Sequence, residues 1–220
     1  MDKNAALAAL EQEMSRAVLP LREANLVFGE GNVDCKVMFI GEAPGETEDR
    51  LKRPFVGRGG QLLDRMIESI GWKRGDTYIT NIVKRRPPQN RDPLPEEIEA
   101  YKPYLTRQIE IMNPPVIVTL GRFSMNYFLP DAKITRDHGR VFNVAAPTSP
   151  DGLRGAQRII YPVFHPAAAL RSPDMMKGLQ EDFQKLPNVA KGEPATNIVL
   201  PNARAEEKIK PKKPRQGSLF

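Results

Sequence analysis

Side chains that can do chemistry gather where three apolar runs of the sequence end, at 37–40, 78–83 and 159–164. In chain order these side chains are Glu42, Glu48, Asp49, Phe55, Asn81 and His165. Apolar runs of this length, bounded by turn residues, are typical of buried parallel strands. Ligands bind beyond the carboxyl ends of such strands, so these side chains are expected to converge there. An acidic surface turn is the simpler alternative for the first loop.

The elements that would position these groups alternate between helix and strand. Apolar spacings of three and four predict helices at 1–18, 61–70, 96–112, 122–128 and 174–186. A further buried strand is expected at 116–120, and a short strand pair around 141–144. Prolines mark 84–95 as a loop. This order predicts an α/β fold, a three-layer α/β/α sandwich around a central, mainly parallel, four-stranded sheet.

Composition limits the partners and the compartment. The 220 residues carry a formal net charge of +6, which favours a polyanionic partner. The single cysteine, Cys35, excludes an internal disulfide and fits a cytoplasmic location. No stretch is long and apolar enough to span a membrane, and no signal peptide is recognised.

The amino-acid composition of the chain changes near residue 187. Residues 1–187 are expected to form one domain, and 188–220 to form a disordered basic tail. The tail holds seven Lys and Arg against three acids, so +4 of the net charge lies outside the domain. Any basic surface on the domain must therefore come from its loops.

Five segments together resemble family 4 uracil-DNA glycosylases, in the order and spacing of that family. The segments are GEAPGETED, PFVGRGGQLLD, YITNIVKRRPPQNRDPLPEEI, VIVTLGR and HPAAALR, and the likeness runs from about residue 27 to 186. The resemblance implies a monomeric DNA-repair enzyme that flips uracil out of DNA and hydrolyses its N-glycosidic bond. Uracil-containing DNA is the implied substrate.

The resemblance gives the residues of the base pocket distinct roles. The ring of Phe55 offers a face on which the flipped base stacks. Asn81 carries a donor and an acceptor that suit the amide-like edge of uracil and mismatch cytosine. His165 can hydrogen-bond the pyrimidine oxygen where negative charge develops. Gly41 and Ala43 are placed in the same substrate pocket. A core phenylalanine, a turn-capping asparagine and a structural histidine are the simpler alternatives.

The acids of the first loop are the candidates to orient water or stabilise a developing sugar cation. Glu42 and Glu48 are the two catalytic candidates besides His165, and Asp49 is a third acid with a weaker claim. The motif does not choose between them, and an acid in a loop is usually only solvated.

DNA contacts are expected from three further places. Glycine N–H groups at Gly59 and Gly60, at a helix start, can hold a phosphate. Leu170 would enter the gap left by the flipped base, and Arg171 would hold phosphate. Arg85 and Arg86 are also candidate phosphate contacts.

The chain departs from the family at its iron–sulfur cluster. Family 4 members usually hold a [4Fe–4S] cluster with four cysteines, and two of those positions are Arg85 and Tyr101 here. The other two fall near Arg16 and Leu19. One thiolate cannot ligate a cluster, so we expect no cofactor and no metal. We expect packing, with Tyr101 and the first helix, to replace the cluster's tethering.

The end of the chain carries a second motif. Gln216, Leu219 and Phe220 match the bacterial sliding-clamp-binding pentapeptide, Gln-x-x-Leu-Phe, after a basic linker. A sliding clamp is therefore a candidate partner. A catalytically weak, clamp-tethered DNA-damage-binding module is the alternative function, and a nucleotide-metabolising enzyme lacks a recognisable triphosphate motif.

Overall fold

The computed structural model describes residues 2–145, 157–192 and 197–199. Its sheet contains seven strands in the order β1-β3-β2-β4-β6-β5-β7. They are β1 (Glu30–Gly31), β2 (Val37–Gly41), β3 (Tyr78–Asn81), β4 (Val116–Leu120), β5 (Val141–Ala145), β6 (Gln157–Val163) and β7 (Asn197–Val199). The central strands β3, β2, β4 and β6 are mutually parallel, as predicted.

The prediction of four strands is wrong in number, because three strands extend the parallel centre. Strand β1 pairs antiparallel with β3, β5 pairs antiparallel with β6, and β7 pairs parallel with β5. Strands β1 and β7 span two and three residues, too short to show an alternating pattern in the sequence. The mixed α/β class holds.

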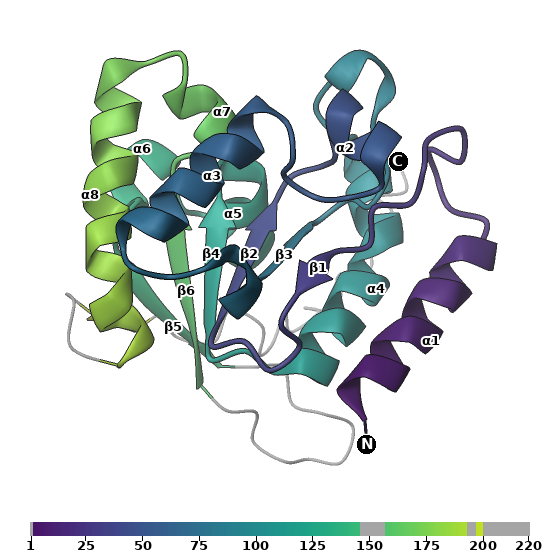
Figure 1. The fold of residues 1–220 in the computed structure, drawn as a ribbon, viewed down its shortest axis with the longest axis horizontal. Helices are drawn as coiled ribbons and strands as arrows, with labels where there is room; N and C mark the ends of the chain where they lie inside the picture. The colour runs from purple at the N-terminus through teal and green to yellow at the C-terminus, as the bar shows by residue number, and fades with distance from the viewer. Residues whose placement is uncertain (1, 146–156, 193–196, 200–220) are drawn as a thin grey trace, which may run out of the picture.

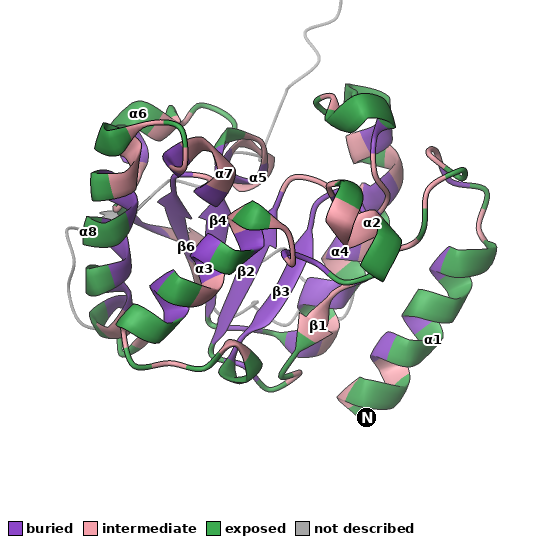
Figure 2. Cartoon of the chain, turned by 45° about the horizontal axis from the view of Figure 1, so that its top comes forward, coloured by how far each residue is buried: buried purple, intermediate pink, exposed green. Residues whose placement is uncertain are grey.

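Helices cover both faces of the sheet and make the fold a three-layer sandwich (Figure 1). On one face, α1 (Lys3–Arg16), α4 (Pro95–Met112) and α5 (Arg122–Phe128) share a core that includes Leu10 and Tyr101. On the other, α3 (Arg58–Ser69) and α8 (Pro173–Ala190) pack around Phe39 and Phe183, whose rings stack 5.8 Å apart. The strands between these layers are buried almost throughout, while the helices expose their outer faces (Figure 2).

Short helices surround the carboxyl ends of the central strands. They are α2 (Glu46–Leu51), α6 (Ile134–Asp137) and α7 (Pro166–Ala169), with a 3₁₀ turn at Pro88–Asn90. A second 3₁₀ turn, at Arg74–Asp76, directly precedes β3. The sequence did not indicate α2 or α7, since four to six residues hold too few turns for a helical period.

The predicted start of the tail falls inside regular structure. Helix α8 continues past Pro187 to Ala190, and β7 joins the sheet beyond it. The expectation of an irregular chain from 188 is therefore wrong for 188–190 and 197–199. Residues 200–220, with Gln216, Leu219 and Phe220, lie outside the described residues. No described helix is long and apolar enough to cross a membrane.

Candidate active site

A cleft of about 790 Å³ opens at the carboxyl ends of β2, β3, β4 and β6. It gathers most of the site residues predicted from the sequence. Those that line it are Glu42, Ala43, Glu48, Phe55, Gly59, Gly60, Asn81, His165 and Arg171. Gly41, Asp49, Arg85, Arg86 and Leu170 do not line it, although Gly41 lies against two residues that do, Phe55 and Asn81.

Gly41 is required because two other residues pack directly on its α-carbon. A β-carbon there would lie 2.5 Å from Asn81 Oδ1 and closer still to the Phe55 ring. Gly60 meets the same constraint, since its β-carbon would collide with the Phe55 carbonyl group. Packing therefore accounts for Gly60, whereas Gly59 has ordinary contacts with Ala167.

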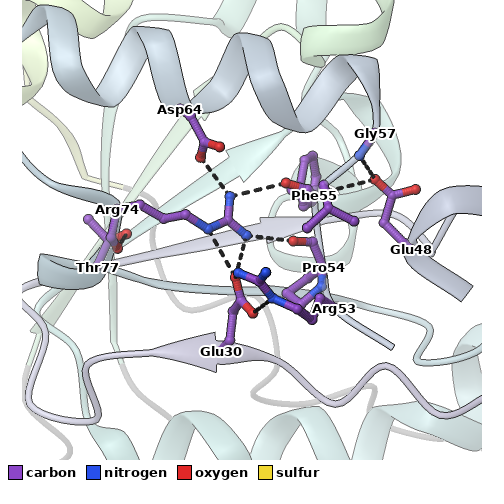
Figure 3. A network of polar contacts seen from close by, with 10 residues as sticks. Glu30, Glu48, Arg53, Pro54, Phe55, Gly57, Asp64, Arg74 and Thr77 are labelled. Carbon is purple, nitrogen blue, oxygen red and sulfur yellow. Dashed lines mark hydrogen bonds and ion pairs between the residues drawn. The ribbon is translucent and has the colours of Figure 1, made fainter. Parts of the chain in front are cut away.

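Phe55 is held in a left-handed backbone conformation, with a φ of 51°. Such a conformation costs free energy in a bulky residue and persists only where neighbours enforce it. Arg74 supplies this restraint, since its Nη1 and Nη2 atoms donate to the carbonyl oxygens of Phe55 (3.1 Å) and Pro54 (2.6 Å). Figure 3 shows Glu30 and Asp64 fixing the same guanidinium, at 2.7 and 2.6 Å.

Glu48 holds the other side of the Phe55 loop. Its Oε1 atom accepts hydrogen bonds from the backbone N–H groups of Val56, at 2.9 Å, and Gly57, at 2.7 Å (Figure 3). These donors stand at the start of α3, where a negative charge is favourable. One carboxylate oxygen of Glu48 is thus committed to the loop.

Asn81 ends β3 with a side chain that is 1% exposed. Its Oδ1 atom has no hydrogen-bond partner within the protein, in the part of the chain that is described. An unpaired buried polar atom is destabilising, so Oδ1 is open to a hydrogen bond from a group that binds in the cleft.

His165 lies at the end of β6 as the N-cap of α7. Its Nδ1 atom accepts a hydrogen bond from the Ala167 N–H at 3.1 Å, so the neutral ring carries its proton on Nε2. Burial lowers the pKa of His165 to about 4, against a smaller opposing effect of Glu48. The ring therefore remains a neutral donor at physiological pH. It lies 5.7 Å from the Phe55 ring, centroid to centroid.

Glu42 differs from Glu48 in its electrostatics. Burial first, and then the charge of Asp92, raise the pKa of Glu42 to about 7, while Arg122 lowers it. A carboxyl group with a pKa near the working pH can accept a proton efficiently. Asp92 and Arg122 line the same cleft and were not recognised from the sequence. For Arg122, the available signal was its place directly after the strand predicted at 116–120, in the segment Gly121-Arg122-Phe123.

The remaining candidates for DNA contact differ in exposure. Arg171 is exposed at the cleft, whereas Leu170 is half-buried against the core shared by α3 and α8. Arg86 donates to Asn90 Oδ1 at 2.7 Å. Arg85 points inward, since its Nη1 atom donates to the Ala24 carbonyl and its Nε atom is buried. The phosphate contact predicted for Arg85 does not fit this arrangement.

The residues at the expected cluster positions do not fit an iron–sulfur cluster. Tyr101 is fully buried and donates to the Pro20 carbonyl oxygen at 2.7 Å, and Arg85 lies beside it. A guanidinium cation and a protonated phenol are not cluster ligands. Hydrogen bonds to Pro20 and Ala24 instead tie the segment after α1 to α4 and to the loop after β3.

Comparison with known proteins agrees with this geometry. Residues 28–187 match the family described as the uracil DNA glycosylase superfamily. The type-4 uracil-DNA glycosylase of Saccharolobus solfataricus is 46% identical over 173 residues, 78% of this chain and 79% of that protein. The type-4 uracil-DNA glycosylase of Thermotoga maritima is 42% identical over 179 residues, 80% and 88% of the two chains. A DNA polymerase of Bacillus phage SP01 is 26% identical over 189 residues, 84% of this chain but 19% of the polymerase.

Residues 28–187, which match the superfamily, contain the four central strands and all the residues that line the cleft. The chain therefore belongs to the uracil DNA glycosylase superfamily, and within it to the type-4 uracil-DNA glycosylases.

Proposed function

We propose that this protein removes uracil from DNA by hydrolysing its N-glycosidic bond, leaving an abasic site. The observation that carries the proposal is the unpaired Oδ1 atom of Asn81, which faces a cleft shared with the Phe55 and His165 rings. The target bond is inaccessible inside a duplex, so the nucleotide must be flipped into this cleft.

Asn81 and Phe55 select and hold the base. Oδ1 accepts the N3–H of uracil, and the amide nitrogen donates to O4. Cytosine presents the opposite pattern on that edge and leaves the buried amide unpaired, which is strongly unfavourable. The base stacks on Phe55, whose loop is fixed by Arg74 and Glu48 before DNA arrives.

His165 and Glu42 carry the bond cleavage. As the bond from C1′ to N1 breaks, its electrons move onto the uracil ring, and the Nε2–H of His165 stabilises the charge on O2. Water attacks C1′ and gives its proton to the Glu42 carboxylate. Glu48 remains bound to the loop through one oxygen, so we assign the base to Glu42.

The cleft favours hydrolysis without strand cleavage. Its lining, among the described residues, contains the basic side chains of Arg58, Arg91, Arg122 and Arg171 but no lysine. A lysine amine is the group that forms a Schiff base with a sugar aldehyde. The arginines instead suit phosphate on either side of the flipped nucleotide, with Gly59, Arg86 and Leu170 as further contacts.

A duplex oligonucleotide with one uracil tests the activity. We expect alkali-labile abasic sites, with no product when uracil is replaced by cytosine. Glu42→Gln should slow single-turnover excision at pH 8 by about 10²-fold or more, the range for loss of a general base. Asn188→Ala, on the exposed face of α8, is the matched control. If the wild-type protein binds uracil-containing DNA tightly but does not excise the base, the result would instead favour a damage-binding module.

We further propose that the protein acts in the cytoplasm as a monomer and reaches a sliding clamp through Gln216, Leu219 and Phe220. The proposal is supported by the lone cysteine and by the terminal match to the clamp-binding pattern. Truncation after Pro214 should abolish clamp binding in calorimetry while excision on a short oligonucleotide stays at the wild-type rate. Equal clamp binding by both proteins would contradict it.

A further inference from the structure

An ion pair lies in the wall of the cleft that also holds Glu42. Arg122, at the start of α5, donates through Nη2 to Asp92 Oδ2 at 2.6 Å. The Arg122 guanidinium also lies over the Phe123 ring, 4.1 Å from its centroid. The pair thus joins the loop after β3 to the helix after β4, and both partners line the cleft that holds Glu42.

The loop holds Asp92 in place independently of Arg122. Arg91 donates to the Asp92 carbonyl oxygen at 3.0 Å and to both Glu97 carboxylate oxygens, at 2.8 and 2.6 Å. Glu97 also accepts from the Leu94 N–H at 2.8 Å, at the start of α4. Glu42 is fixed too, because its carbonyl oxygen accepts from the Val83 N–H at 3.0 Å. The backbone that carries the two carboxyl groups is therefore held without Arg122.

Few other charges compete for influence on Glu42. The charged and titratable groups around the cleft are Glu46 and Glu48 of α2, Arg58 of α3, Arg91 and Asp92 of the loop, Arg122 of α5, and His165 and Arg171 beside α7. Glu48 is occupied by two N–H groups, and the Glu46 side chain is 78% exposed. Water screens an exposed charge strongly, and it also weakens the effects of Asp92 and Arg122, whose side chains are 64% and 61% exposed. Asp92 and Arg122 are the two groups whose charges act on Glu42.

We propose that Asp92 and Arg122 are positioning residues that set the lower pH limit of uracil excision, Asp92 by favouring the protonated Glu42 and Arg122 by favouring its carboxylate. This inference rests on the proposed role of Glu42 as the base. The two charges have opposite effects on Glu42. Removing Asp92 should therefore move the lower pH limit of excision down, and removing Arg122 should move it up. A purely structural role predicts loss of rate in both variants without opposite shifts.

The test measures the carboxyl group and the reaction separately. The Glu42 carboxyl carbon is followed by NMR in ¹³C-labelled protein, assigned with Glu42→Gln, in Asp92→Asn, Arg122→Gln and the control Glu46→Gln. We expect the pKa of Glu42 to fall by about 0.5–1 unit in Asp92→Asn and to rise by about as much in Arg122→Gln, as for one charge at short range in a solvated cleft. The control Glu46→Gln should leave the pKa of Glu42 unchanged.

Single-turnover excision at saturating enzyme, measured from pH 5 to 9, should show its acid limb moving by the same amounts. Unchanged titration in both charge variants, or shifts in the same direction, would overturn the charge effect even if excision is normal. A different outcome is that the NMR titrations of Glu42 move as expected while the acid limb of the excision rate stays fixed. Glu42 would then not be the base, and the ion pair would have no link to excision.

Discussion

The end of β3 and the loop after it hold equally buried polar side chains that differ in how they are paired. Asn81 faces the cleft at 1% exposure and leaves Oδ1 without a partner. Lys84, three residues on, is fully buried on the opposite side and donates to Thr80 Oγ1 at 2.5 Å and Gln108 Oε1 at 2.7 Å. Gln108 donates in turn to Tyr78 and to the Phe28 carbonyl oxygen, at 3.1 and 3.2 Å.

This difference separates a binding surface from a structural one. Desolvation lowers the pKa of Lys84 well below its usual range. The Lys84 amine finds two acceptors inside the protein, on Thr80 and Gln108. The Lys84 network is complete without a ligand, whereas Asn81 Oδ1 is left without a partner in the protein among the described residues. Burial alone does not identify a site, but an unpaired atom within a cleft does.

The largest expected effect is on the cleft side. His165→Ala should slow single-turnover excision by about 10²–10³-fold, the cost of losing one transition-state hydrogen-bond donor. His165→Asn should be equally slow, because asparagine can still cap α7 but cannot place a donor where Nε2 lies. The asparagine variant should therefore keep more stability than the alanine variant at the same loss of rate. A wild-type excision rate in either variant would remove His165 from the site.

A matched pair of amide deletions gives the next largest effect. Gln108→Ala breaks three hydrogen bonds and leaves Lys84 with an unpaired N–H, so it should lower the free energy of unfolding by about 1–3 kcal/mol. Asn81→Ala leaves no such group unpaired and should cost less, while it abolishes the preference for uracil over cytosine. Urea denaturation and excision assays measure both quantities.

The comparison between the two amides fails if Asn81→Ala is the more destabilising substitution. It also fails if Gln108→Ala changes base preference while the protein remains folded, because the Lys84 network would then contribute to the cleft.

The sequence predicted the elements with a sustained apolar period and the residues directly after them. The bounds 116–120 and 122–128 agree with β4 and α5, and Asn81 and His165 lie at the strand ends where they were expected. The missed strands and helices are too short to show a period. The missed residues that shape the site, Arg74, Glu30, Asp64, Asp92 and Arg122, come from separate loops and helices whose meeting depends on tertiary packing.

The smallest expected effect concerns pH and the Lys84 side. Burial lowers the pKa of Lys84 in the folded protein, so the unfolded chain binds more protons than the folded protein between the lowered pKa and about 10.4, the ordinary value for lysine. The free energy of unfolding should therefore rise with pH across that window, by at most about 1.4 kcal/mol per pH unit from this residue. In Lys84→Met the amine is absent, so the part of the rise in unfolding free energy that Lys84 causes should disappear. Denaturation of both proteins at pH 7.5, 8.5 and 9.5 measures the difference, with Lys102→Met, on the exposed face of α4, as the control for a lysine that stays in contact with water. Parallel pH profiles for wild type and Lys84→Met would mean that Lys84 is charged in the fold, and the claim that its network is complete without a ligand would fail.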